Sequence, residues 1–208
     1  MPRDLREACI VEALAIVEQS GVEHLSMREV ARRLGVSHQA PYKHFASRDH
    51  ILAEIVSRAY RNFIRHLSAS PQTDDPAADM ARMGQRYIRY AIDHPLQYRL
   101  MFESPLPEPS EHPEMMQQAN RAFALLRDCL QRLPRGNTDQ ADQAVDAAAL
   151  FVWSTVHGLS GVLRSAVVHT LQLPDAVLAD AVNSTLAHIG RAIGTAPPSH
   201  HSNSGGSQ

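Results

Sequence analysis

Two short stretches, each beginning with a serine and separated by a Gly-Val dipeptide, constrain the fold more than any other part of the sequence. Ser26 and the glutamate three residues later have the spacing of a capping box, which predicts that a short helix begins there. Gly35 is predicted to end this helix, because glycine is the usual residue just after a helix. Ser37 then predicts the N-cap of a second short helix that runs through about His44. Two short helices joined by a tight turn, after a longer amphipathic helix, are typical of a helix-turn-helix motif.

The rest of the chain also has the apolar periodicity of helices, and no segment alternates cleanly enough to predict a strand. We therefore predict an all-α fold of about nine helices, with a three-helix helix-turn-helix head and a larger helical body. Polar and proline-rich runs mark the breaks, and residues 103–114, with four prolines, are predicted to be a loop. The last two helices are predicted at about 138–169 and from Pro174, as the first helical residue, to Ile193.

Charge is unevenly distributed along the chain. The formal net charge is −2, yet residues 28–48 hold five basic residues and a single acidic one. Local basic density matters more for phosphate contact than the total charge, so this segment suits nucleic acid. No stretch reaches the roughly 18–20 continuous apolar residues of a membrane span, and the first helix lacks a small-residue cleavage site. We therefore expect a cytoplasmic protein with no membrane partner.

Metal, cofactor and catalytic patterns are missing from the sequence. The twelve histidines form no HxxxH or HExxH pair, so no metal site is predicted. Cys9 and Cys129 lie far apart and form no CxxC pair, and we expect both to be reduced and buried. Neither a nucleophile elbow nor a glycine-rich phosphate loop occurs, so we predict no catalytic residues, no cofactor and no enzyme activity.

The second short helix suits a DNA major groove better than a protein core, because Tyr42 is almost its only apolar residue. Gln39 can pair with adenine, and His38 or Lys43 can reach guanine acceptors or phosphate. Tyr42, His44 and Arg48 suit phosphate contacts. The alternative interpretation is a solvated polar helix in a helical bundle. The predicted DNA-binding residues are Arg28, Ser37, His38, Gln39, Ala40, Tyr42, Lys43, His44 and Arg48.

The run SMREVARRLGVSHQAPYKHFASRDHIL, residues 26–52, resembles the DNA-binding signature of the TetR/AcrR family of transcription regulators. The residues in register are Ser26, Val30, Ala31, Gly35, Val36, Ser37, Tyr42, His44, Phe45, Arg48, Asp49, Ile51 and Leu52. The resemblance covers about residues 5–65. Farther on, HPLQYRLMFE (94–103) and Trp153 with His157-Gly158 resemble a subgroup of this family with a Trp…His-Gly motif in its C-terminal domain.

The resemblance implies a homodimer that binds palindromic operator DNA and represses transcription until a small effector releases it. It also implies that the last two of the nine predicted helices form a four-helix bundle with those of a second subunit, and that the fifth to eighth helices surround an effector pocket. The predicted domains are a DNA-binding head at 1–46, a linking helix at 47–68, an effector-binding and dimerisation domain at 69–195, and a disordered tail at 196–208.

Residues for an apolar effector are predicted from their large, polarisable side chains, although such side chains are more common in an ordinary core. They are Tyr87, Tyr90, Phe102, Met115, Phe123, Trp153 and His157. His157 lies one turn from Trp153 on an apolar helix, where a hydrogen-bonded core histidine is the alternative to an effector anchor. The last helix carries an apolar stripe wider than one neighbouring helix requires, which independently predicts a partner surface. The stripe comprises Val177, Leu178, Ala181, Val182, Thr185, Leu186, Ile189 and Ile193.

Two positions depart from the common pattern of the family. Gln39 stands where a small residue is usual, and Pro41 stands where an aliphatic residue is usual. Proline cannot donate a backbone hydrogen bond and disfavours a helical conformation at the residue before it. The start of the recognition helix is therefore expected to be distorted or 3₁₀-like.

Two other classes of protein stay open at this point. One is a helical ligand-binding protein or enzyme whose head does not function, and the other is a thiol-based DNA-binding sensor that uses Cys9 or Cys129.

Overall fold

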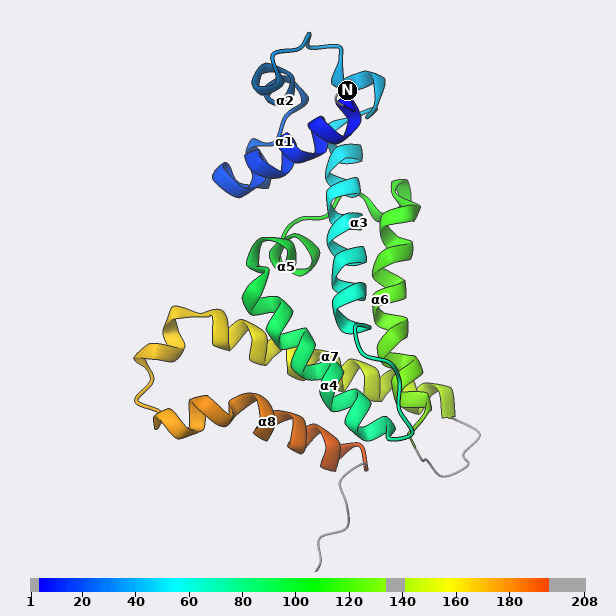
Figure 1. The fold of residues 1–208 in the computed structure, drawn as a ribbon, viewed down its shortest axis with the longest axis vertical. Helices are drawn as coiled ribbons and strands as arrows, with labels where there is room; N and C mark the ends of the chain where they lie inside the picture. The colour runs from blue at the N-terminus through cyan, green and yellow to red at the C-terminus, as the bar shows by residue number, and fades with distance from the viewer. Residues whose placement is uncertain (1–3, 134–140, 195–208) are drawn as a thin grey trace, which may run out of the picture. The chain divides into compact units, whose positions relative to one another are not determined.

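The computed structural model describes residues 4–133 and 141–194, and this part of the chain contains eight α-helices, four 3₁₀ helices and no strand. The predicted all-α fold is confirmed (Figure 1). The α-helices are α1 (Leu5–Ser20), α2 (Met27–Leu34), α3 (Arg48–Leu67), α4 (Pro76–Asp93), α5 (Pro95–Phe102), α6 (Pro113–Gln131), α7 (Ala141–Arg164) and α8 (Asp175–Ala192). The 3₁₀ helices are η1 (Val22–His24), η2 (Pro41–Lys43), η3 (Pro109–Glu111) and η4 (Ala166–Thr170).

The helix boundaries in the head follow from residues seen in the sequence. Ser26 accepts a hydrogen bond from the backbone N–H of Glu29 at 3.2 Å, and Ser47 accepts one from His50 at 3.3 Å. Each bond satisfies one of the N–H groups that a helix start leaves without a partner. Gly35 ends α2 with φ of 67°, a left-handed conformation that glycine adopts without the steric cost of a Cβ.

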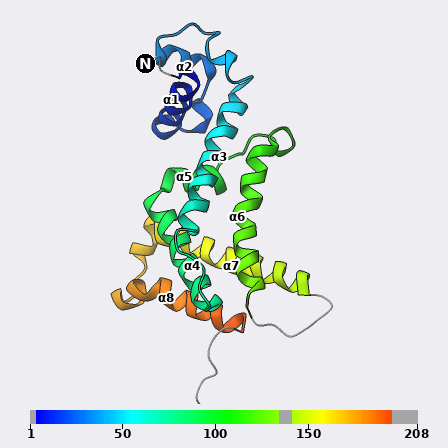
Figure 2. The ribbon, with the colours of Figure 1, turned by 45° about the vertical axis from the view of Figure 1, so that its right-hand side comes forward.

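The first three α-helices pack through the apolar faces that their periodicity predicts. α1 packs against both α2 and α3, and the two views show it between them (Figures 1 and 2). Cys9, Ala13 and Ile16 are almost fully buried on α1, as are Val30 and Ala31 on α2. Cys9, Ala13 and Ile16 lie three or four positions apart and Val30 and Ala31 are adjacent, so each helix turns one face toward the core.

The segment after Gly35 is where the predicted secondary structure is wrong. Instead of an α-helix over Ser37–His44, the chain forms turns at 38–40 and then the short 3₁₀ helix η2. Pro41 opens η2, and its missing N–H removes a bond that an α-helix starting at Ser37 would need. The expected distortion thus extends over the whole segment and not only its first turn.

Other boundaries differ by small shifts. Pro174 is the N-cap of α8 and not its first helical residue, and the predicted helix at 138–169 is α7 followed by η4. The predicted loop at 103–114 contains η3 and the start of α6. The predicted tail at 196–208 lies outside the described residues.

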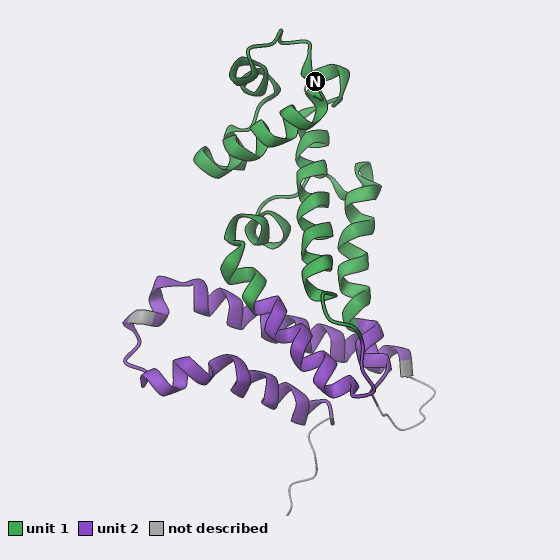
Figure 3. Cartoon of the chain, in the orientation of Figure 1, with its two compact units in different colours: residues 1–71, 89–126 green, residues 72–88, 127–208 purple. Residues whose placement is uncertain are grey.

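The chain divides into two compact units (Figure 3). The first comprises residues 1–71 and 89–126, and therefore holds the head together with α5 and most of α6. The second comprises residues 72–88 and 127–208, with the start of α4 and the helices α7 and α8. The predicted boundaries at residues 46 and 68 separate regions by function and not by compactness, so they stay a prediction.

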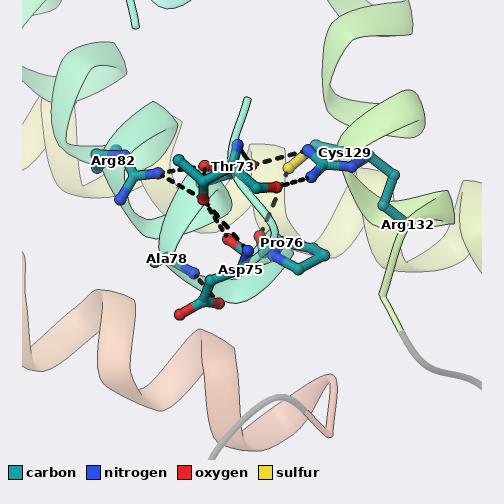
Figure 4. Close-up of polar contacts among 8 residues, drawn as sticks. Thr73, Asp75, Pro76, Ala78, Arg82, Cys129 and Arg132 are labelled. Carbon is teal, nitrogen blue, oxygen red and sulfur yellow. Dashed lines mark hydrogen bonds and ion pairs between the residues drawn. The ribbon is translucent and has the colours of Figure 1, made fainter. Parts of the chain in front are cut away.

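Inside the second unit, Asp79 on α4 joins three segments of the chain. Its carboxylate accepts hydrogen bonds from Thr73 N and from Arg132 Nη1, at 2.9 and 2.8 Å, and it also pairs with Arg82. Figure 4 shows Thr73, Arg82 and Arg132 gathered around this point. The backbone bond from Thr73, followed by the bond from Arg132, lowers the pKa of Asp79 well below its ordinary value. This network fixes the start of α4 against the end of α6.

By length and composition, one described helix is apolar enough to cross a membrane, at Asp142–Arg164. Its mean hydropathy is 1.2, and 28% of its most apolar window is buried inside the structure. A single such helix is weak evidence for a span, since a helix that packs against another subunit has the same composition.

Candidate nucleic-acid interface

The segment from Ser37 to His44 presents its polar side chains to solvent while two apolar residues hold it in place. Ser37, His38, Gln39, Lys43 and His44 are all exposed, and Tyr42 is 49% exposed. Ala40 is half-buried. Pro41 and Phe45 are buried and anchor the segment to the head.

Phe45 has a specific neighbour in the first helix. The guanidinium of Arg6 on α1 lies 5.3 Å from the centroid of the Phe45 ring, within the range of a cation–π contact. The buried ring of Phe45 holds the segment against the head. The side chains of Tyr42, Lys43 and His44 are exposed to solvent. The arrangement suits a surface that reads base edges and phosphates.

Two of the basic residues near this surface are already paired. Arg32 and Arg33 both donate to the Glu29 carboxylate, at 2.7 and 2.9 Å for the closest pairs. The bonds from Arg32 and then Arg33 lower the pKa of Glu29 to about 2. Arg33 also reaches Glu12 on α1 at 3.3 Å, so it joins the two helices.

Arg28 and Lys43 are different, because both are exposed and neither is paired with a carboxylate in the described part of the chain. Lys43 belongs to the Ser37–His44 surface, and Arg28 lies on α2, which packs against η2. An exposed cation beside polar side chains is the electrostatic footprint of phosphate binding.

Arg48, which was also predicted to contact phosphate, has a structural role. Its Nε donates to the Leu25 carbonyl at 2.9 Å, and its Nη2 donates to the Val22 carbonyl at 2.6 Å. Its Nη1 pairs with Asp49 at 3.0 Å. Arg48 therefore ties the start of α3 to the turn between α1 and α2, and a phosphate contact would use only its remaining N–H groups.

Three of the predicted effector residues are joined by hydrogen bonds in the second unit. The indole N–H of Trp153 donates to the Tyr87 hydroxyl at 3.1 Å, and this hydroxyl lies 3.2 Å from Nδ1 of His157. Tyr87 is buried on α4, while Trp153 and His157 are half-buried on α7. The three side chains therefore connect α4 to α7 through polar atoms.

The other four predicted effector residues lie in the first unit. Tyr90 and Phe102 both contact the ring of Phe63, with centroids 5.0 and 5.9 Å away. Burial raises the pKa of Tyr90 to about 12, so its hydroxyl stays protonated. Met115 is almost fully buried and Phe123 is half-buried.

Both cysteines are buried, and burial raises the pKa of each thiol above its ordinary value. Reactive sensor cysteines are exposed and have lowered pKa values, so neither thiol has the environment of a redox sensor. No cluster of three potential metal ligands occurs among the described residues.

Comparison with known proteins identifies the family. The model for the C-terminal domain of tetracyclin repressor-like proteins matches residues 80–185, which is about half of the chain. A second model, for bacterial regulatory proteins of the tetR family, matches residues 10–55. The chain belongs to the TetR family. The N-terminal match contains α2, the exposed Ser37–His44 segment and Arg48.

Individual TetR family relatives have low sequence identity to this chain. The HTH-type transcriptional regulator Rv1816 of Mycobacterium tuberculosis is 26% identical over 114 residues, which are 50% of this chain and 48% of Rv1816. The chain thus spans about half the length of the curated relatives it matches. SCO4313, described as a regulatory protein, has a similar structure, with a TM-score of 0.70, 23% identity, and 91% and 98% of the two chains covered.

A third structural similarity shows that the fold alone does not identify the function. The superantigen PfiT has a TM-score of 0.67 to this chain at 14% identity, with 89% of this chain and 96% of that chain covered. A shared fold does not carry a shared function, so function must be argued from the site.

Sequence reasoning missed the residues that hold the exposed surface in place. The carbonyls of Val22 and Leu25, which bind Arg48, leave no signal in the sequence because any residue supplies a carbonyl. One sequence feature could have indicated the structural role of Arg48. It is the first residue after the N-cap Ser47, where a positive charge interacts unfavourably with the helix dipole.

Proposed function

We propose that this chain is a one-component transcription regulator that binds a palindromic operator as a homodimer and is released by a small apolar effector. The observation that carries the proposal is the exposed Ser37–His44 surface, which includes the exposed cation Lys43 and lies inside the segment matched by the N-terminal family model. Arg28, a second exposed cation, lies in the same matched segment. Repression and location in the cytoplasm, where such a regulator meets DNA, are part of the same proposal.

Direct contact with DNA is assigned to the predicted residues, of which Arg48 would use only the N–H groups that its bonds within the head leave available. Gln39 would read a base edge, while Lys43, Tyr42 and Arg28 would bind phosphate. In a dimer the two surfaces would enter successive major grooves about 34–36 Å apart, which requires a palindromic site.

The dimer is proposed to form through α7, α8 and the segment that joins them, where large apolar residues are exposed. They are Leu150, Phe151, Val162, Val167, Leu171, Leu173 and Val177. Monomeric proteins rarely expose so many apolar side chains on adjoining elements, and a four-helix bundle between two subunits would cover them. Gly158 on α7 supports this proposal, because a Cβ added there would meet no atom within 4 Å.

The effector is proposed to bind near Trp153, where the hydrogen bonds of Tyr87 and His157 offer polar anchors in an apolar setting. By this proposal the Trp…His-Gly motif marks a subgroup of the family that shares the site. An effector that separates α4 from α7 would shift the linking helix α3 and change the spacing of the two heads.

Selection of an operator from random duplex DNA tests the proposal. The Tyr42→Ala/Lys43→Ala variant should lose at least tenfold in affinity for the selected operator, with a salt dependence smaller by about one phosphate contact. The control variant, Arg89→Ala/Ile92→Ala, also removes one cation and one exposed large side chain, but both lie on α4 away from the head. Equal affinity of the two variants would refute the assignment.

The two rival classes predict other results. A ligand-binding protein or enzyme with a non-functional head would select no operator at all. A thiol sensor would release DNA on oxidation and lose this response in a Cys129→Ser or Cys9→Ser variant, a behaviour that the burial of both thiols opposes.

A further inference from the structure

A cleft with a volume of about 840 Å³ opens in the first unit, between α1, α3, α5 and α6. This volume falls within the range of small-molecule sites in proteins. All of its lining residues belong to the first unit, and Tyr87, Trp153 and His157 are absent from the lining. The cleft is therefore separate from the proposed effector site.

The floor of the cleft is apolar. Ile10 on α1, Ile55 and Ala59 on α3, and Leu100 on α5 line it and are almost fully buried. Val11 also lines the cleft, yet it is 60% exposed, so a large apolar side chain faces solvent at this place. A ligand that covered Val11 would be stabilised, because apolar surface would be removed from water.

The lining is cationic as well as apolar. Four arginines line it, from α3 and α6, against a single carboxylate, Glu7. Glu7 is already occupied, because Arg58 donates to both of its oxygens at 2.7 Å. The bond from Glu7 and the bond from Glu54 raise the pKa of Arg58 above its ordinary value. Arg58 and Glu7 thus neutralise each other.

The other cations of the cleft are less satisfied. Arg61 donates to Glu54, which also serves Arg58 and Arg6, so one carboxylate is shared among three cations. Arg65 donates to the neutral amide oxygen of Asn62, at 3.0 Å. In the described part of the chain, neither Arg65 nor Arg121 has a carboxylate partner. An excess of positive charge therefore faces an apolar floor.

We propose that this cleft binds a small carboxylic acid with an apolar body. The guanidinium groups of Arg65 and Arg121 hold the carboxylate, for which their planar fork is suited, and the apolar body lies on Ile10, Val11 and Leu14. Gln97 and Gln118, which also line the cleft, supply amide groups for any further polar atom of the ligand.

The ligand would contact two parts of the chain with different roles. Ile10, Val11 and Leu14 belong to α1 of the head, whereas Leu100 and Arg121 belong to α5 and α6. Binding would restrain the head relative to these helices and so change operator affinity, a consequence that rests on the proposed function. The binding step itself does not, and it is tested without DNA.

Isothermal titration of the full chain with decanoate and with 4-phenylbutyrate provides the test. The Arg65→Gln/Arg121→Gln variant should bind both acids at least tenfold more weakly than the parent chain. The control variant Arg89→Gln/Arg99→Gln removes the same charge from exposed positions outside the cleft and should bind within twofold of the parent. Decanol, which lacks the carboxylate, should bind both variants alike.

A charge placed on the exposed wall provides a second measurement with little risk to the fold. Val11→Glu should weaken decanoate binding at least fivefold, while Val11→Lys, of similar size, should not. The proposal is overturned if neither acid binds, if the two arginine variants bind equally, or if Val11→Glu and Val11→Lys behave alike. Binding that changes Trp153 emission but ignores all of these variants would place the acid at the effector site, and would also overturn it.

Discussion

Replacing Arg48 with alanine separates two roles that the structure and the sequence assign to this residue. The side chain donates two charge-assisted hydrogen bonds, to the carbonyls of Val22 and Leu25, and it is 36% exposed. If its role is structural, Arg48→Ala should lower stability. If its role is phosphate binding, the variant should lower operator affinity without unfolding the head.

The size of the stability loss follows from these two bonds. A hydrogen bond to a charged group contributes about 1.5–3 kcal/mol, and partial exposure favours the lower end of that range. Both carbonyls can bind water once the side chain is removed, so we expect a total loss of about 2–3 kcal/mol. In a domain of 150–250 residues this lowers the unfolding midpoint by roughly 4–12 °C.

Chemical and thermal unfolding, followed by circular dichroism, measure the loss. Lys43→Ala is the matched control, because it removes one exposed cation with no carboxylate partner and should change stability by less than about 0.5 kcal/mol. Operator affinity should fall for Lys43→Ala at a temperature where both variants are folded. An Arg48→Ala protein as stable as the parent but with weakened operator binding would refute the structural role.

Three further predictions follow from single contacts. Gly158→Trp should fold but sediment as a monomer, since a Cβ added at Gly158 has no neighbouring atom within 4 Å. The control Asn120→Trp, on the exposed side of α6, should stay dimeric. The pKa of Glu29 is lowered to about 2, so its pairs stabilise the fold fully above its ordinary value of 4.5. This stabilisation should vanish as the pH falls from 4.5 to 2, and the unfolding free energies of the parent and Glu29→Gln should converge over that range. Tyr87→Phe removes the hydroxyl contacts with Trp153 and His157 and should shift Trp153 emission, and unchanged emission would show that these contacts are absent in solution.

The head was largely predictable because its signals are local. A serine three residues before a free backbone N–H, and a glycine at a left-handed position, act within one turn of the chain. Ser26, Ser47 and Gly35 therefore mark the boundaries that the structure has. The shape of the Ser37–His44 segment was less predictable, since Pro41 has two opposite effects. It removes a hydrogen bond that a helix needs, but its fixed φ favours the 3₁₀ turn that forms.

The cleft could not have been predicted from the sequence. Its residues come from four helices, and no spacing along the chain brings Val11, Arg65 and Arg121 together. Arg61 and Arg65 lie four residues apart on α3 and would be interpreted as ordinary solvated charges. Only the packing of α1 and α6 on either side of α3 turns them into part of a site.

The apolar stripe of α8 shows what periodicity can and cannot say. Of the eight residues predicted to form it, the structure buries only Leu186 and Ile189, and Val177 is 54% exposed. Leu186 is fixed by Gly84 on α4, where a Cβ would lie 2.4 Å from Leu186 Cδ2. Apolar residues on a helix can pack against their own chain or against another subunit. The sequence pattern alone therefore does not separate core from interface. The part of the stripe that this chain leaves exposed is therefore the part that argues for a second subunit.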